Sequence, residues 1–128
     1  MAIEDLMQNV KTRRYVVEES MLNINNTLFG GEAMGWMDKV GHELSIDLTR
    51  HTMFTAAADK IRFRSAVLLG ETVEVTARPL ELGPVKLQVS LTVVADPDGP
   101  NRRTALTGIY TFVQVDEQMR PRRITYIE

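Results

Sequence analysis

Two features near the start of the chain have residue types suited to acid–base chemistry, a carboxylate and a pair of glycines. Asp38 directly follows Trp36 and Met37 in a stretch whose apolar residues have helical spacing, so its side chain is expected to be partly desolvated. Desolvation raises the pKa of a carboxylate, which suits a general base near neutral pH. Gly30 and Gly31 precede the same helix, where free backbone N–H groups can bind a developing oxyanion. Base and oxyanion donor would then lie on one element.

Asp38 and the glycine pair also have a structural interpretation. Asp38 could be a solvated helical carboxylate that pairs with His42 one turn later. We expect His42 to be a structural partner of Asp38 or Glu43 rather than a catalytic acid. Two glycines before a helix are common in plain loops, so the catalytic interpretation depends on their position beside a potential base.

The polar segment before the helix likewise has two interpretations. Asn25, Asn26 and Thr27 are typical turn and helix-cap residues. Alternatively, Asn23, Asn25 and Thr27 could orient a water molecule or a substrate carbonyl.

Other kinds of site lack their sequence patterns. His42 and His51 are the two histidines, and their separation of nine positions fits no common zinc spacing. That spacing argues against a metal site, and because the chain has no cysteine, neither a thiolate metal site nor a thiol nucleophile is predicted. No serine lies in a Gly-x-Ser-x-Gly motif, and no glycine-rich phosphate loop is present, which argues against a serine triad and a nucleotide cradle.

Basic residues gather on one predicted strand. Lys60, Arg62 and Arg64 alternate along it and are therefore expected to share one face. A phosphate-bearing ligand across that face is one interpretation, and an exposed strand edge protected by charge is the other. Arg102 and Arg103 have the same two interpretations, with the exposed one favoured.

The helix that would position Asp38 is predicted from its apolar spacing. One buried stripe at i, i+3, i+4 and i+7 is formed by Met34, Met37, Val40, Gly41, Leu44 and Leu48. The methionines and Trp36 are most simply core residues, although a flexible methionine wall also suits an acyl chain.

Beyond residue 51 the hydrophobic pattern changes from helical to alternating. Strands are predicted at 13–17, 52–64, 73–78, 85–93 and 104–115, with turns at 69–71, 79–84 and 96–100. Long antiparallel strands curl, and a single amphipathic helix is a natural filling for such a sheet. The predicted fold class is therefore α+β, with one long central helix wrapped by a curved antiparallel sheet. Apolar residues on both faces of 104–115 predict cover by a second copy.

Length and composition favour a single domain over residues 1–128, with a loose N-terminal arm or helical turn at 1–12 and a C-terminal extension at 117–128. The extension is a candidate final strand or partner contact. A net charge of −2 without aromatic platforms argues against nucleic-acid binding. The chain shows no signal peptide and no run of roughly 18 apolar residues, so a cytoplasmic protein without a membrane partner is expected.

Several of these residues also form a recognisable pattern. It consists of Asn23, the run Thr27-Leu28-Phe29-Gly30-Gly31, Met34-x-Trp36-Met37-Asp38, Phe63 and Val67-x-x-Gly70-Glu71. The pattern resembles the hotdog-fold acyl-CoA thioesterases, in the group that includes YciA-like and cytosolic acyl-CoA hydrolases. The resemblance covers roughly residues 13–116 and agrees with a helix wrapped by a sheet.

The resemblance implies hydrolysis of the thioester between coenzyme A and an acyl group, with no separate cofactor because coenzyme A enters as part of the substrate. Asp38 would be the base or nucleophile that activates water, and the Gly31 N–H would polarise the thioester carbonyl. Asn23 and Thr27 fall in the loop that faces the helix Asp of a second subunit. The site would thus be built across a homodimer, the minimal unit of a tetramer or hexamer. Implied substrate-binding residues are Phe29, Gly30, Met34, Lys60, Arg62 and Arg64, the basic three lying near the coenzyme A phosphates.

Three positions depart from similar sequences. Ser65-Ala66-Val67 stands where proline is usual, Lys39 stands where an acidic residue often follows the helix Asp, and His42 replaces a small or apolar residue. These changes leave the expected fold unchanged and bear on substrate range and rate. The alternative function is a non-catalytic acyl-CoA-binding module, either a metabolite sensor or an assembly subunit. Hydratase or dehydratase chemistry ranks last, because it needs an Asp and a His separated by four residues on a loop.

Overall fold

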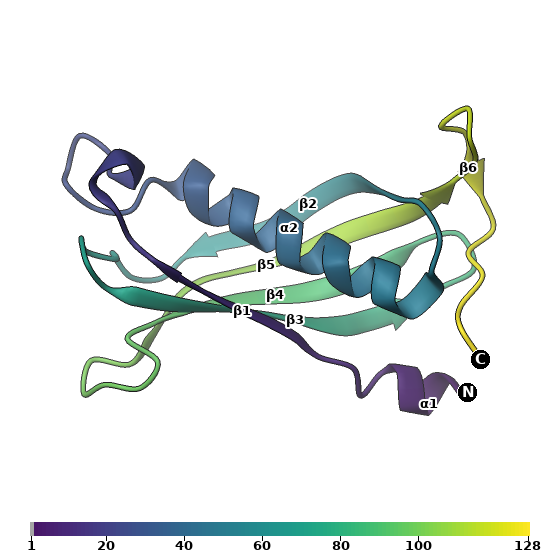
Figure 1. The fold of residues 1–128 in the computed structure, drawn as a ribbon, viewed down its shortest axis with the longest axis horizontal. Helices are drawn as coiled ribbons and strands as arrows, with labels where there is room; N and C mark the ends of the chain where they lie inside the picture. Colours follow the sequence, from purple (N-terminus) through teal and green to yellow (C-terminus); the bar gives the residue numbers. More distant parts are fainter. Residues whose placement is uncertain (1) are drawn as a thin grey trace.

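In the computed structural model, which describes residues 2–128, a curved antiparallel sheet wraps one long helix, α2 (Gly30–Thr49) (Figure 1). The strands are β1 (Lys11–Val16), β2 (Met53–Phe63), β3 (Thr72–Leu82), β4 (Leu87–Ala95), β5 (Arg103–Val115) and β6 (Pro121–Arg122). The short α1 (Ile3–Leu6) and the 3₁₀ helix η1 (Glu19–Met21) flank β1. The predicted α+β architecture is confirmed.

The sheet has the strand order β1-β3-β4-β5-β2, and the short β6 pairs with the end of β5. The long strand β2 therefore pairs with β5, the last long strand, rather than with its neighbour in sequence, β3. As a result β1 and β2 form the two edges of the main sheet.

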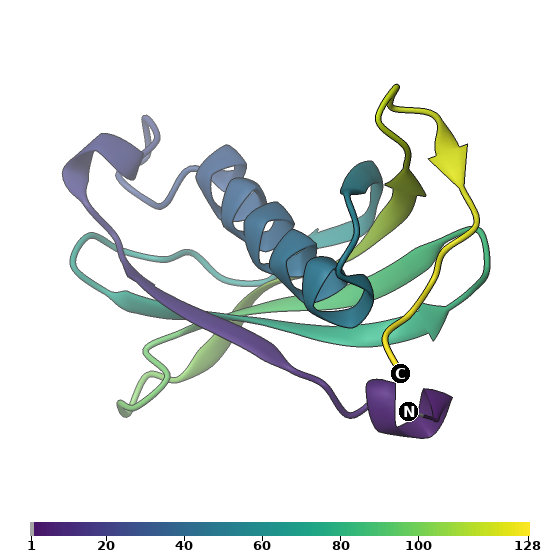
Figure 2. The same cartoon turned by 45° about the vertical axis from the view of Figure 1, so that its right-hand side comes forward.

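Helix α2 lies across the concave face of the sheet, as the turned view shows (Figure 2). The predicted stripe is buried from Met37 through Leu48, whereas Met34 is only half-buried. Alternate residues of β3, β4 and β5 form the other side of the core, among them Val75, Leu91 and Phe112, each 0% exposed. Within residues 2–128, no helix is long and apolar enough to cross a membrane.

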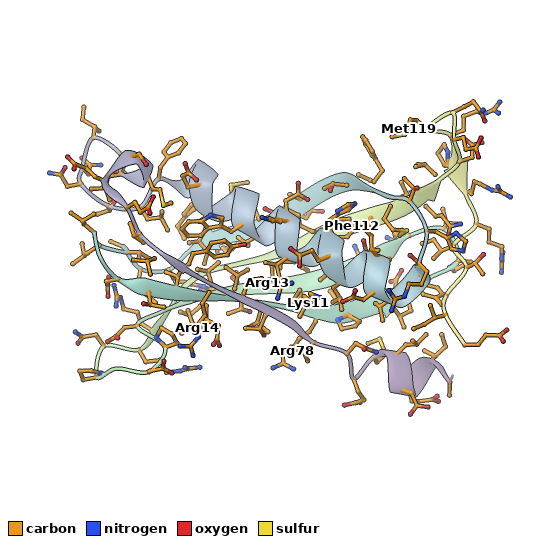
Figure 3. The ribbon with its side chains drawn as sticks, viewed as in Figure 1. Lys11, Arg13, Arg14, Arg78, Phe112 and Met119 are labelled. Atoms are coloured by element: carbon orange, nitrogen blue, oxygen red, sulfur yellow. The ribbon has the colours of Figure 1, made fainter. Side chains whose placement is uncertain are left out.

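The edge strand β1 fastens the helix from one side. Side chains on its inner face reach α2, and in Figure 3 Lys11 and Arg13 lie along this strand. The three contacts are the ion pairs Lys11–Asp47 (3.0 Å) and Arg13–Glu43 (2.9 Å) and the stacked rings of Tyr15 and Trp36, with centroids 4.6 Å apart. These contacts link the charged side of α2 to β1.

Two predicted boundaries are wrong by several residues. Strand β3 continues through Pro79 to Leu82, so the turn expected at 79–84 comes later, where the Gly83 N–H donates to the Lys86 carbonyl (3.0 Å). Proline fits within β3 because β1 pairs only as far as Ala77, so the missing N–H removes no bond on that side. Strand β4 consequently starts at Leu87, and Val85 lies in the turn with 68% of its surface exposed.

Both chain ends pack onto the same end of the core (Figures 1 and 2). The described part of the expected arm, residues 2–12, is anchored rather than loose, because Leu6 in α1 is only 1% exposed. Met1 lies outside the described residues. In the C-terminal extension Ile124 is buried, and the Ile127 N–H donates to the Leu48 carbonyl at the end of α2 (2.9 Å).

Burial of the α2 stripe predicts how stability depends on this helix. We expect Leu44→Ala to lower the free energy of unfolding by about 2–5 kcal/mol, because Leu44 is 1% exposed and its truncation leaves a cavity. The exposed Lys39→Ala on the same helix should change it by less than about 0.5 kcal/mol. Urea denaturation at one protein concentration measures both, and equal effects of the two substitutions would contradict this packing.

Candidate functional site

A cavity of about 530 Å³ lies where the loop before α2 meets the segment after β2. The two segments lie at the same end of the molecule as the start of α2 (Figure 1). The cavity is lined by Asn23, Asn25, Thr27, Leu28, Phe29, Gly30, Phe63, Arg64, Ser65, Ala66, Val67 and Leu106. Its lining thus combines a mostly apolar interior with amide and hydroxyl groups and one guanidinium.

The loop in front of α2 is held by Asn23. Its side-chain oxygen accepts hydrogen bonds from the backbone N–H groups of Asn25 (2.9 Å) and Thr27 (3.2 Å), and its amide donates to the Thr27 hydroxyl (3.0 Å). Asn26 takes a left-handed φ of 60°, as a tight turn requires. The prediction that these residues turn the chain is confirmed, but the prediction that they cap the helix is wrong. The N-cap is Phe29, without a side-chain cap hydrogen bond.

The glycine pair opens α2 and leaves its donors free. Within residues 2–128 the backbone N–H groups of Gly30 and Gly31 have no hydrogen-bond acceptor. Two phenyl rings cover the pair: a Cβ on Gly30 would lie 2.7 Å from the Phe63 ring, and one on Gly31 would lie 2.5 Å from the Phe29 ring. Larger residues would displace these rings. Gly31 does not line the cavity; it lines an adjacent depression with Phe29.

Asp38 lies two turns further along α2, on the side of the helix that faces β2. Its half-buried carboxylate accepts a hydrogen bond from the Thr55 hydroxyl (2.7 Å). Asp38 is not part of the cavity lining, so a single chain does not bring it together with Asn23 and Thr27.

The expected pairing of His42 is wrong. Its Nε2 lies 2.7 Å from the Met53 carbonyl at the start of β2 rather than near Asp38, while Glu43 pairs with Arg13. Since a carbonyl only accepts, Nε2 carries the proton in this contact. His42 therefore fastens α2 to β2.

Tyr110 on β5 bonds the first turns of α2. Its hydroxyl donates to the carbonyl of Met34 (2.8 Å). Met34, which was expected to bind substrate, therefore lies beside β5 and does not line the cavity. Burial, together with the negative charge of Asp38, raises the pKa of Tyr110 to about 12.

The prediction that Lys60, Arg62 and Arg64 share one face of a regular strand is wrong. The register with β5 slips between Asp59 and Arg62, and Lys60 takes a left-handed φ of 52°. This bulge breaks the alternation that would align Lys60 with Arg62. Arg64 lies beyond the last residue of the strand and lines the cavity, whereas Lys60 and Arg62 do not.

Several contacts at the site have no local signal in the sequence. Thr55 and Tyr110 reach α2 only because β2 and β5 pair beneath it, and Arg103 is an ion-pair partner rather than a free surface charge. Glu71, which pairs with Arg103, does stand in the recognised motif. Over residues 2–128, no three His, Cys, Asp or Glu side chains gather to hold a metal ion.

Comparison with known proteins identifies the family. The sequence profile described as the thioesterase superfamily matches residues 25–100, more than half of the chain. The chain belongs to the thioesterase superfamily. The matched span contains Thr27, the glycine pair and Asp38, and begins two residues after Asn23.

Individual relatives agree with this assignment. The acyl-CoA thioester hydrolase YciA of Escherichia coli is 26% identical over 107 residues, which cover 80% of each chain. The crystal structure of an acyl-CoA hydrolase from Bacillus cereus superposes with a TM-score of 0.84 at 25% identity, covering 93% of this chain and 73% of that one. A hexameric broad-specificity acyl-coenzyme A thioesterase gives a TM-score of 0.79 at 25% identity, covering 88% and 79%. The hotdog fold and the resemblance found in the sequence are confirmed.

The effect of the Asp38 charge on Tyr110 predicts that the two groups titrate together. Asp38→Asn should lower the pKa of Tyr110, because it removes the negative charge that disfavours the phenolate. Tyr126 is an internal control: its pKa of about 12 comes from burial and Glu81, so it should not move.

Residue-resolved NMR titration of ¹³C-labelled tyrosines measures both values. Since the folded chain holds these protons above the ordinary pKa of 10.0, stability should fall as the pH rises from about 10 to about 12. An unchanged Tyr110 titration in Asp38→Asn would show that the carboxylate is not directed at the phenol.

Proposed function

We propose that this protein is an acyl-CoA thioesterase that hydrolyses acyl-coenzyme A to a free acid and coenzyme A. The observation that carries the proposal is the arrangement on α2 within the matched family span. Free N–H groups stand at the helix start, and a half-buried carboxylate lies two turns later. Relatives with this span are named acyl-CoA thioester hydrolases.

In the proposed reaction, Asp38 removes a proton from a water molecule whose oxygen attacks the thioester carbonyl carbon. The resulting oxyanion is stabilised by the Gly31 N–H at the positive end of the helix dipole. The C–S bond then breaks, and the proton held by Asp38 passes to the departing thiolate. No separate cofactor enters this scheme, because coenzyme A arrives as part of the substrate.

The proposed site needs a second copy of the chain. Residues 56–60 of the edge strand β2 are exposed, and its outer backbone groups are available to another strand. Antiparallel pairing of two β2 strands about Ala58 would set Thr55 of one chain opposite Ile61 of the other. The partner's Asp38, bonded to its own Thr55, would then approach the cavity beside Phe63 and Arg64.

This pairing makes a homodimer the minimal unit, with Asn23, Thr27 and Gly31 from one chain facing the partner's Asp38. A structurally similar thioesterase is hexameric, which supports further assembly of such dimers into a tetramer or hexamer. The apolar cavity with Phe29 and Gly30 is proposed to hold the acyl end of the substrate.

The charged end of the substrate is proposed to meet the basic residues at the end of β2. Arg64 lines the cavity, and within the described residues its guanidinium forms no ion pair, which leaves it available for a phosphate. Lys60 and Arg62 lie on the bulged, exposed part of the same strand. Met34 on α2 is proposed to contact the acyl chain from the side of the helix.

The test is release of free coenzyme A from short, medium and long acyl-CoAs by the wild type and Asp38→Asn. We expect turnover to fall by about 10²- to 10⁴-fold in the variant, the range for a lost general base. Asp47→Asn is the matched control: Asp47 lies on the same helix but faces β1, so its turnover should match the wild type.

Full turnover by Asp38→Asn would contradict the assigned role of the carboxylate. If the wild type binds acyl-CoA saturably but shows no turnover, the protein is instead a non-catalytic acyl-CoA-binding module.

A further inference from the structure

We propose that Arg103 and Glu71 are positioning residues that hold the cavity wall and, through it, the loop in front of α2. This inference rests on the proposed thioesterase function of that loop. The two residues do not line the cavity, and neither is assigned a role in the reaction above.

The Arg103 guanidinium binds four acceptors at once. It makes a two-pronged ion pair with Glu71, with N···O distances of 2.6 and 3.0 Å, and also donates to the carbonyls of Ala66 (2.8 Å) and Asn101 (2.9 Å). Glu71 in turn accepts the Leu68 N–H (2.8 Å). The segment after β2 is therefore fastened on both sides of residue 67.

Val67 and its neighbour also bond the loop in front of α2, so this restraint extends to that loop. The Val67 carbonyl accepts the Leu28 N–H (2.8 Å), and Thr27 forms an antiparallel bridge with Leu68. Leu28 precedes the phenyl ring and glycine pair at the start of α2. A shift of the 64–68 segment would thus move the oxyanion donors and the cavity wall together.

The Arg103–Glu71 pair is less exposed to solvent than an ordinary surface ion pair of this protein. Its side chains are 28% and 20% exposed, whereas Arg14 and Asp98, a pair on the sheet surface, are 46% and 75% exposed. Two parallel N–H···O bonds fix orientation as well as distance. The Arg103 side chain holds the pKa of Glu71 below its usual range, so the carboxylate stays charged through neutral pH.

The Arg103 bond also restrains a segment that contains no proline. Residues 65–67 are Ser, Ala and Val, and a proline would limit the backbone freedom of such a loop. The Arg103 bond to the Ala66 carbonyl restrains the segment through a side chain instead.

The test compares Arg103→Met and Arg103→Lys with the control Arg102→Met. Arg102 is adjacent in sequence but bonds the Pro97 carbonyl rather than Glu71. We expect Arg103→Met to lower kcat for acyl-CoA about 10- to 100-fold, with KM changed less than about threefold, because misplaced groups slow the chemical step more than binding. Arg103→Lys should fall between, since lysine keeps the charge but not the fork.

Amide hydrogen exchange gives a readout that does not depend on turnover. In Arg103→Met, exchange of the hydrogen-bonded amides of Leu28, Phe29 and Arg64 should be at least about tenfold faster than in wild type, while the Leu44 amide in mid-helix stays protected. Glu71→Gln, which keeps the shape and the Leu68 bond, should show the same pattern more weakly and serves if Arg103→Met does not fold.

The two proposals fail in different ways. A wild type that hydrolyses no acyl-CoA would refute the proposed function, while faster exchange in the variants would still support the restraint. Wild-type kcat and wild-type exchange of the Leu28 and Phe29 amides in folded Arg103→Met would overturn the positioning role itself.

Discussion

Burial of one apolar stripe of α2 against the curved sheet is the constraint on which the rest of the structure depends. The stripe sets the rotation of the helix about its axis, and the rotation decides what each remaining side chain meets. Asp38 faces β2 and bonds Thr55, whereas Glu43 and Asp47 face β1 and its basic residues. Among residues 2–128, α2 is the one long helix on the sheet. Its packing in the core therefore also determines the direction in which the proposed base points.

Sheet topology explains why the proposed site is incomplete in one chain. Because β2 pairs with β5 and, among residues 2–128, with no strand on its other side, Asp38, His42 and the bulge at Lys60 all lie along an open edge. The loop with Asn23 lies near the far end of the same strand, and Asp38 does not reach it. In the proposed dimer, β2 joins a copy of itself and so places both halves of a site within reach of one another.

Much of this fold could be predicted from sequence because its signals are local. Spacing along α2 marks the stripe, and alternation marks β3, β4 and β5, whose buried faces follow it. The position of the glycine pair ahead of this stripe placed it at the start of the helix. Local periodicity fails where the chain departs from regular geometry: the bulge at Lys60 reverses the faces of β2, and Pro79 continues a strand that it was expected to end.

Contacts at the candidate site were less predictable, since they join residues distant in sequence. The Asp38–Thr55, His42–Met53 and Glu71–Arg103 contacts depend on strand pairing that no short stretch encodes. His42 illustrates the difficulty: a helical neighbour at i−4 offered an obvious partner, yet a backbone carbonyl on β2 satisfies the imidazole. The sequence around Arg103 is typical of a surface charge, because its partner Glu71, just before β3, lies far away along the chain.

The central claim, that each site combines Asp38 of one chain with the loop and Gly31 of its partner, is tested most directly by complementation. Asp38→Asn and Gly31→Pro, which removes the oxyanion donor and displaces the Phe29 ring, are each made alone and then co-expressed. If the site is shared, mixed dimers contain one intact site, and turnover should rise to about a quarter of wild type with random pairing. Turnover no greater than the mean of the two variants would show that base and oxyanion donor act within one chain.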